Sequence, residues 1–215
     1  SVVLSGCSEM SSFQSSFAVR PPVSVDMSFD VSGSSIADNE FQKNAKKACK
    51  DLINNHLHHN DTVAFSAFAA GVASAGEQVF QNQIDSVGMC NAASKQIAKI
   101  QRKKVVSKEP GTFLTKPLEY SDRILTRSAA NQQPSSKIVV VMLQADDPNT
   151  NKNPSPQVGE VINRLINKKA TVLILTEDSS LNSRLNTLVQ DSHFKTCPTA
   201  DYASCLNWAF SQAFN

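Results

Sequence analysis

The fold is decided by residues 137–143, Lys137-Ile-Val-Val-Val-Met-Leu143, which form an almost unbroken apolar run. A second run of the same kind occupies residues 170–176, Ala170-Thr-Val-Leu-Ile-Leu-Thr176. Strands that are apolar at successive positions are covered on both faces, which is typical of a parallel sheet with helices on either side. The two runs therefore predict two central strands of such a sheet.

Strand and helix patterns alternate through the rest of the chain. Residues 23–29 alternate between apolar and polar side chains with the period of a strand, and residues 62–68 indicate a further strand. Between them, apolar residues recur at helical spacing after Asp38, a residue suited to cap a helix. Further helices are predicted over residues 91–106, 118–128, 158–168, 181–190 and 203–214. We expect an α/β fold with a doubly wound, mostly parallel sheet flanked by helices in three Rossmann-like layers.

Composition excludes several classes of protein. The chain has 215 residues, enough for one domain with a continuous core, and a formal net charge of +2. Such a balance argues against a nucleic-acid partner, because proteins that bind nucleic acid are usually clearly basic. The sequence contains neither the Gly-x-Ser-x-Gly elbow of hydrolases nor the phosphate-binding Gly-x-x-x-x-Gly-Lys loop. Its 28 serines and 17 asparagines are typical of envelope and extracellular proteins.

The N-terminal segment Leu4-Ser5-Gly6-Cys7 resembles a bacterial lipobox, and a serine-rich stretch typical of a flexible tether follows it. The resemblance implies that Cys7 carries a lipid and that Ser8 directs the protein to the outer membrane. We therefore expect residues 1–20 to be a residual signal and tether, and residues 21–215 to be one domain facing the periplasm. The alternative is an unmodified tail with a chance cysteine.

The five cysteines are an odd set without a Cys-x-x-Cys pair, so neither a zinc ribbon nor a thioredoxin-type redox centre is indicated. Cys197 and Cys205 lie eight residues apart across a predicted turn, where an exported protein is expected to form a disulfide. Cys49 belongs to the apolar stripe of the predicted helix. Cys49 is therefore expected to be either a buried free thiol or disulfide-bonded to Cys90.

The segment Phe29-Asp30-Val31-Ser32-Gly33-Ser34-Ser35 follows the first predicted strand, where ligands bind in open α/β sheets. Asp30, Ser32 and Ser34 are spaced two residues apart, so on an extended turn their side chains project to the same side. One carboxylate and two hydroxyls are hard oxygen ligands that suit Mg²⁺ or Ca²⁺. The alternative is that Asp30 caps the next helix and the serines bond to backbone amides.

In this position, Asp30-Val31-Ser32-Gly33-Ser34 resembles the metal-ion-dependent adhesion site of von Willebrand factor A (vWA) domains. The resemblance implies the vWA fold and a divalent cation, Mg²⁺ or alternatively Ca²⁺ or Mn²⁺. It further implies a threonine ligand from a later loop, for which Thr112 is the match and Thr115 the alternative. The last ligand would be an aspartate after the fourth strand, Asp146 or else Asp147, although this chain lacks the family's Thr-Asp-Gly there.

Three functions follow. The leading hypothesis is a non-catalytic module, anchored in the envelope by lipid, whose cation accepts a carboxylate from another envelope protein. The second is a metal-independent subunit of a large envelope assembly, such as a secretion, conjugation or motor complex. A metal-dependent phosphoesterase is less favoured, since the strand ends offer carboxylates but no histidine base.

Two weaker signals have simple explanations. His56, His58 and His59 near a predicted helix end are accounted for by the helix dipole. Residues 95–137 hold ten Lys and Arg against three acidic residues. A solvated face explains this excess, and an acidic partner or anionic lipid headgroups are the alternatives.

Overall fold

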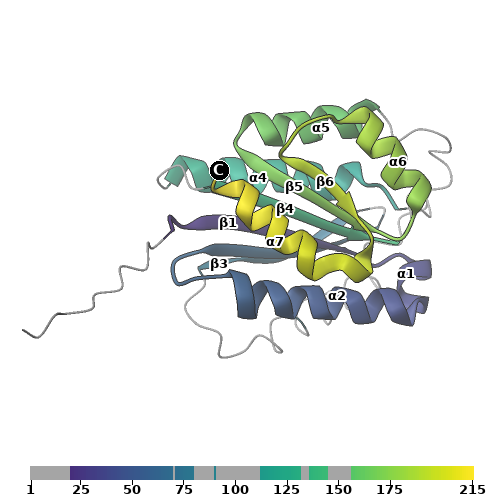
Figure 1. Cartoon of the computed structure of the whole chain (residues 1–215). Coiled ribbons are helices and arrows are strands. Elements are labelled where there is room, and N and C mark those ends of the chain that lie inside the picture. The colour runs from purple at the N-terminus through teal and green to yellow at the C-terminus, as the bar shows by residue number, and fades with distance from the viewer. Residues whose placement is uncertain (1–19, 70, 80–89, 91–111, 132–135, 145–155) are drawn as a thin grey trace, which may run out of the picture.

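The computed structural model describes residues 20–69, 71–79, 90, 112–131, 136–144 and 156–215 (Figure 1). Six strands form one sheet in the order β3-β2-β1-β4-β5-β6. Their bounds are β1 (Val23–Asp30), β2 (Thr62–Phe68), β3 (Val72–Val79), β4 (Ser136–Leu143), β5 (Ala170–Thr176) and β6 (Phe194–Cys197). All neighbouring pairs are parallel except β2 and β3, which are antiparallel. The predicted mostly parallel α/β sheet is confirmed.

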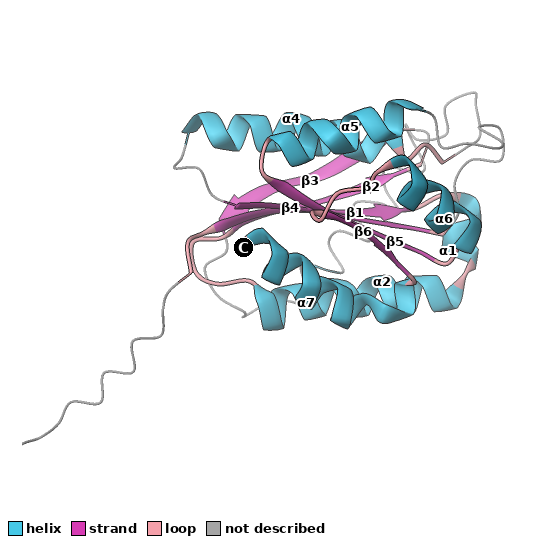
Figure 2. Cartoon of the chain, turned by 45° about the horizontal axis from the view of Figure 1, so that its top comes forward, coloured by secondary structure: helices cyan, strands magenta, loops and turns pink. Residues whose placement is uncertain are grey.

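Helices cover both faces of the sheet, which gives three layers (Figure 2). On one face lie α2 (Asn39–Asp51), its π-helical extension η1 (Leu52–His56) and α7 (Tyr202–Ala213). On the other face lie α4 (Thr115–Asn131), α5 (Pro156–Asn167) and α6 (Ser179–Leu188). Two short helices, α1 (Gly33–Ala37) and η3 (Thr199–Asp201), follow β1 and β6. In the described parts of the chain, no helix is both long enough and apolar enough to cross a bilayer.

The apolar run of β4 contributes to two separate cores. Ile138, Val140 and Met142 pack in the core beneath α2 and α7. The intervening Val139, Val141 and Leu143 pack beneath α4, α5 and α6. Successive side chains of a strand point to opposite faces, so only an unbroken apolar run satisfies both layers.

The helix α2 begins where its sequence predicts. Asp38 precedes it, and the Asp38 carboxylate accepts hydrogen bonds from the backbone amides of Glu40 and Phe41 at 3.0 Å each. These bonds satisfy amides that have no partner within the helix. The stripe of Phe41, Ala45, Ala48 and Cys49 is buried against the sheet.

Two disulfides cross-link the described chain. Cys49 at the end of α2 is bonded to Cys90, with an S–S distance of 2.07 Å. Cys197, the last residue of β6, is bonded to Cys205 in α7 at 2.08 Å. The bond to Cys90 decides between the two alternatives open for Cys49. Cys7 and the helix predicted over residues 91–106 lie outside the described residues.

Candidate functional site

The candidate site lies where the central strand β1 ends. Asp30 is the last residue of β1 and is 1% exposed. Its Oδ1 accepts a hydrogen bond from the Ser32 amide at 2.8 Å. Its Oδ2 accepts bonds from the Ser35 hydroxyl at 2.5 Å and from the Gln144 amide at 3.2 Å. Donors from the following turn and from the end of β4 therefore fix the orientation of this carboxylate.

The serines divide between the carboxylate and the solvent. Ser35 is buried and turns inward onto Asp30, whereas Ser34 is exposed and Ser32 is half-buried. The Ser32 Oγ lies 3.3 Å from the Ser34 Oγ and 3.1 Å from the Ser35 Oγ. The two hydroxyls expected as ligands are thus adjacent and reachable from solution.

This donor set fits a small divalent cation. Adjacent ligands of an octahedral Mg²⁺, each about 2.1 Å from the ion, are roughly 3 Å apart. The spacing of 3.3 Å between the Ser32 and Ser34 hydroxyl oxygens is close to that value. Asp30 Oδ2 already accepts two hydrogen bonds, but Oδ1 accepts one from the described residues and keeps a second lone pair. No group of three or more His, Cys, Asp or Glu side chains suited to a metal occurs within the described ranges, so hydroxyls would supply much of the coordination.

The electrostatics of the turn depend on its burial. Burial raises the pKa of Asp30 above its usual value, while hydrogen bonds from Ser35, Ser32 and Gln144 act in the opposite direction. The pKa of the half-buried Asp38 is lowered, chiefly by the Phe41 amide and then by the Gln144 side chain. A bound cation would favour the charged form of Asp30, because a metal is the largest local charge in such a site.

The threonine loop is fastened to the same edge of the sheet. Thr112 is buried, and the next residue, Phe113, donates its amide to the Ala69 carbonyl at 3.1 Å. Phe68, the last residue of β2, directly precedes Ala69. Its carbonyl accepts a hydrogen bond of 2.9 Å from the Val31 amide. Backbone bonds therefore join the loops that carry Asp30 and Thr112. Thr115, the alternative ligand, is the first residue of α4 and is half-buried.

Gln144 occupies the position that follows β4, and Asp146 and Asp147 lie outside the described residues. The Gln144 amide donates to Asp30, and the Gln144 side-chain Nε2 donates to Asp38 Oδ2 at 2.8 Å. Its carbonyl accepts a bond from the Thr176 hydroxyl at the end of β5. Gln144 and Ser35 are the two polar contacts of Asp30 that sequence reasoning missed. The signal for Gln144 was its place directly after an apolar run, where strand-end ligands are sought.

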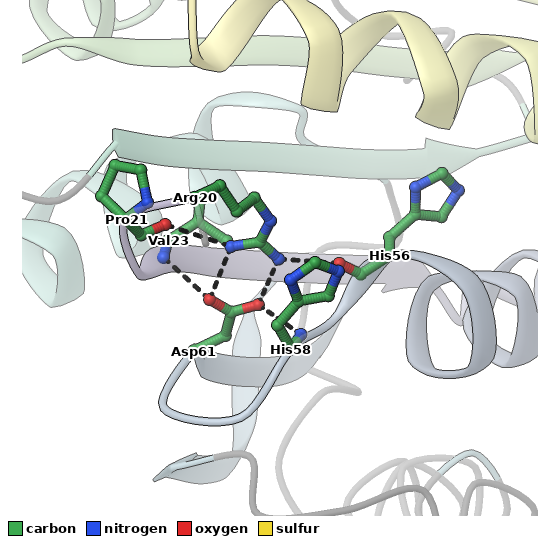
Figure 3. Close-up of polar contacts among 6 residues, drawn as sticks. All are labelled: Arg20, Pro21, Val23, His56, His58 and Asp61. Carbon is green, nitrogen blue, oxygen red and sulfur yellow. Dashed lines mark hydrogen bonds and ion pairs between the residues drawn. The ribbon is translucent and has the colours of Figure 1, made fainter. Parts of the chain in front are cut away.

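A second polar cluster lies at the opposite end of β1, where the chain enters the sheet (Figure 3). The Arg20 guanidinium forms two hydrogen bonds with the Asp61 carboxylate, of 2.9 and 2.5 Å, and donates to the His56 carbonyl at 2.8 Å. Asp61 also accepts the amides of Val23 and His58 and is 0% exposed. The cluster holds the start of β1 against the loop that precedes β2.

His56 is a packed histidine of the core. Its ring stacks on Phe210 with a centroid distance of 4.8 Å, and its Nε2 lies 3.3 Å from Asp51 Oδ2. Burial lowers the pKa of His56 and the nearby Arg20 lowers it further, while Asp51 acts in the opposite direction. These contacts account for His56 without a metal.

The sheet order and the helices on both faces match the three-layer α/β fold of vWA domains. A von Willebrand factor type A structure from Catenulispora acidiphila is 18% identical with a TM-score of 0.57, over 89% of this chain and 42% of that one. Proximal thread matrix protein 1 from the mussel byssus is 15% identical with a TM-score of 0.63, over 89% and 48% of the two chains. Manganese-loaded TRAP protein from Plasmodium vivax is 14% identical with a TM-score of 0.58, over 87% and 73%.

These identities establish the fold alone. The chain spans less than half the length of the first two structures. No family model matches the sequence, and no curated protein matches it either.

Proposed function

We propose that this chain is a non-catalytic protein-binding module whose contact surface is the carboxyl edge of the sheet around Asp30. The observation that carries the proposal is the pair of adjacent, solvent-reachable hydroxyls of Ser32 and Ser34 beside a buried carboxylate held by three donors. A strand-end turn with this arrangement presents oxygen ligands outward from a rigid base. A solved structure with the same fold, the TRAP protein of Plasmodium vivax, is manganese-loaded, which supports a divalent cation as the ligand.

In the proposed site, Asp30, Ser32, Ser34 and Thr112 hold Mg²⁺, or alternatively Ca²⁺ or Mn²⁺, with Asp146 as a further ligand. When bound, the cation supplies positive charge to which a carboxylate of the partner binds. Ser35 and Gln144 keep the Asp30 carboxylate in one orientation. The bond from Val31 to the β2 end keeps the turn in register with the Thr112 loop.

The proposed setting is the bacterial envelope, with a lipid on Cys7 in the outer membrane and other envelope proteins as partners. The two disulfides support this setting, because disulfides persist in oxidising compartments such as the periplasm. The lipobox-like segment gives the attachment point. Intact mass of the protein from its native cells tests the lipid directly.

The cation-dependent binding is tested by capture of envelope proteins on the full chain in Mg²⁺ and in EDTA. We expect chelation to abolish binding, and we expect Asp30→Ala and Ser32→Ala to do the same in Mg²⁺. Ser32→Ala leaves the backbone bond from residue 32 to Asp30 available, so it probes the hydroxyl without dismantling the turn. Ser179→Ala is the matched control, because Ser179 is an exposed serine at the same edge, at the start of α6. Binding that survives both EDTA and Asp30→Ala contradicts the mechanism.

One observation favours a second candidate, the metal-independent subunit of an envelope assembly. Ser35 and Gln144 both donate to Asp30 Oδ2, so the turn is held by protein contacts alone. A stoichiometric complex that remains intact in EDTA would support this candidate. A freely monomeric protein in native membranes extracted with EDTA would count against it.

The distribution of histidines weighs against an enzyme at this edge. All four histidines of the chain, His56, His58, His59 and His193, precede strands and lie at the amino end of the sheet. A phosphoesterase at Asp30 would therefore have no histidine as general base. Turnover of phosphoester substrates that depends on Asp30 would overturn this assignment.

A further inference from the structure

The N-terminal segment enters the domain at the amino end of the sheet, which is the end opposite the candidate cation site. Arg20 lies just before β1 and is held by Asp61 and the His56 carbonyl (Figure 3). Its guanidinium also lies over the rings of Phe210 and Phe214, at 5.8 and 5.1 Å from their centroids. Arg20 is thirteen residues on from Cys7, a length of chain that spans at most about 45 Å. A lipid on Cys7 would therefore hold this end of the domain within about 45 Å of the bilayer.

Among the described residues, the same end carries a cluster of basic side chains around one acid, Asp122. Arg164 in the last turn of α5 and Lys168 just after it both pair with Asp122, at 3.5 and 2.5 Å. Lys137, near the start of β4, donates to the Lys168 carbonyl at 3.3 Å. Lys169 follows at the turn into β5 and is exposed. Within the described residues the cluster thus holds four basic side chains and one carboxylate, and Arg164 and Lys168 are 50% and 38% exposed.

A helix C-terminus favours cations, and this effect explains Arg164 and Lys168. It does not explain Lys169, whose φ of 64° lies in the left-handed region that glycine or asparagine normally occupies. The turn needs only the residue 169 amide, which donates to the Ile166 carbonyl at 2.8 Å. Lys137 adds a further basic group, although the residue is only 8% exposed and burial lowers its pKa, as do Lys168 and Lys169, while Asp122 acts in the opposite direction. A requirement for positive charge at this end would account for Lys169, and Lys137 bonds to the Lys168 carbonyl just after α5.

The opposite end of the sheet is acidic. Beside Asp30 and Asp38, exposed carboxylates follow β5 and β6 at Glu177 and Asp201, and Glu40 begins α2. Acidic residues thus outnumber the exposed Lys116 at this end, and basic residues outnumber the exposed Asp191 at the amino end, so the described part of the molecule is polarised along its strands. An anionic surface would attract the amino end and repel the carboxyl end.

From this polarity and the position of the tether, we infer that the amino end of the sheet, with Arg164, Lys168 and Lys169 at its surface, docks on anionic lipid headgroups. The inference rests on the proposed envelope anchoring and adds to it an orientation. The lipid would attach the protein, and the basic cluster would turn the domain so that Ser32 and Ser34 face away from the membrane. Combining one lipid signal with a basic patch is a recognised way to make membrane attachment stable.

The test uses the full chain with Cys7→Ser, so that no lipid contributes, and sedimentation with vesicles of phosphatidylglycerol or of phosphatidylcholine in EDTA at low salt. The double variant Arg164→Gln/Lys169→Asn removes two charges, and asparagine tolerates the left-handed conformation at residue 169. Each basic residue near an anionic surface contributes about five-fold to binding, so we expect the double variant to bind phosphatidylglycerol about 25-fold more weakly.

The matched control is Lys46→Gln/Lys47→Gln, which makes the same change in net charge on the exposed side of α2. We expect this control to bind within about two-fold of the unmodified chain, and added salt to weaken binding of both. Equal losses in the two double variants, or equal binding to both lipids, would overturn the inference. Because EDTA removes divalent cations from these mixtures, failure here leaves the Asp30 binding test standing, and failure at Asp30 leaves this result standing.

Discussion

At the scale of single residues, Asp61 shows how the fold accommodates a fully buried charge. Its carboxylate accepts two bonds from Arg20 and one each from the amides of Val23 and His58. An ionised group taken out of water is stable only when it is paired and hydrogen-bonded. The start of β1 and the loop before β2 thus depend on one another.

We expect Arg20→Ala to lower the free energy of unfolding by about 3 kcal/mol, because it leaves the Asp61 charge buried without its partner. Urea unfolding of the full chain measures the change. The double variant Arg20→Ala/Asp61→Asn should recover part of the loss, since it removes the uncompensated charge. Lys46→Ala, which removes an exposed cation, is the control and should change the free energy by less than about 0.5 kcal/mol. A loss for Arg20→Ala no larger than that of the control would contradict this role of Arg20.

Residue chemistry at the candidate site was only partly predictable. The alternation of Asp30, Ser32 and Ser34 indicated oxygen ligands, and the structure places the Ser32 and Ser34 hydroxyls side by side. The contact of Ser35 with Asp30 was missed because the turn was treated as extended. In the structure α1 begins at Gly33, and its curvature brings Ser35 back to the carboxylate.

Gln144 was missed for a different reason. It reaches Asp30 only because β4 pairs with β1 in a register that places Phe29 beside Met142. A pairing between strands so far apart in sequence leaves no local pattern. The sequence therefore indicated the edge of the sheet but not the contact.

At the scale of elements, each disulfide fastens a helix on the α2 and α7 face. The Cys49–Cys90 bond spans 41 residues of sequence and the Cys197–Cys205 bond spans 8. A cross-link that closes a longer loop removes more conformational freedom from the unfolded chain.

We therefore expect Cys49→Ala/Cys90→Ala to lower the free energy of unfolding by about 4 kcal/mol and Cys197→Ala/Cys205→Ala by about 2.5 kcal/mol. Denaturant unfolding under non-reducing conditions measures both, and each double variant serves as the control for the other. The reverse order of the two losses would show that loop closure is not the dominant effect of these bonds.

Elements differ in how far their sequence predicted them. The strand predicted over residues 170–176 is β5 with the same bounds, because a strand buried on both faces has to be apolar throughout. β3 was missed because its sequence, Val-Ala-Ser-Ala-Gly-Glu-Gln-Val, is small and polar. Its strand conformation comes from antiparallel pairing with the edge of β2. The five-residue α1 is too short for a helical periodicity to emerge.

At the scale of the whole molecule, β1 separates two ends for which we propose different roles. The strand has eight residues, so its ends are about 25 Å apart. The N-terminal segment joins one end at Arg20, and the candidate cation site lies at the other. A partner bound at Asp30 would meet the domain on the side opposite its proposed membrane attachment.

The central claim is that the turn after β1 holds a divalent cation, and calorimetric titration of the full chain with Mg²⁺ or Mn²⁺ tests it most directly. We predict a single saturable site that is about ten-fold weaker or more in Ser32→Ala, because each lost ligand or support of a metal site weakens it by roughly this factor. Asp30→Asn should abolish the site, and Ser179→Ala should leave it unchanged. No saturable binding by the unmodified chain, or equal binding by the unmodified chain and Asp30→Asn, would contradict the claim.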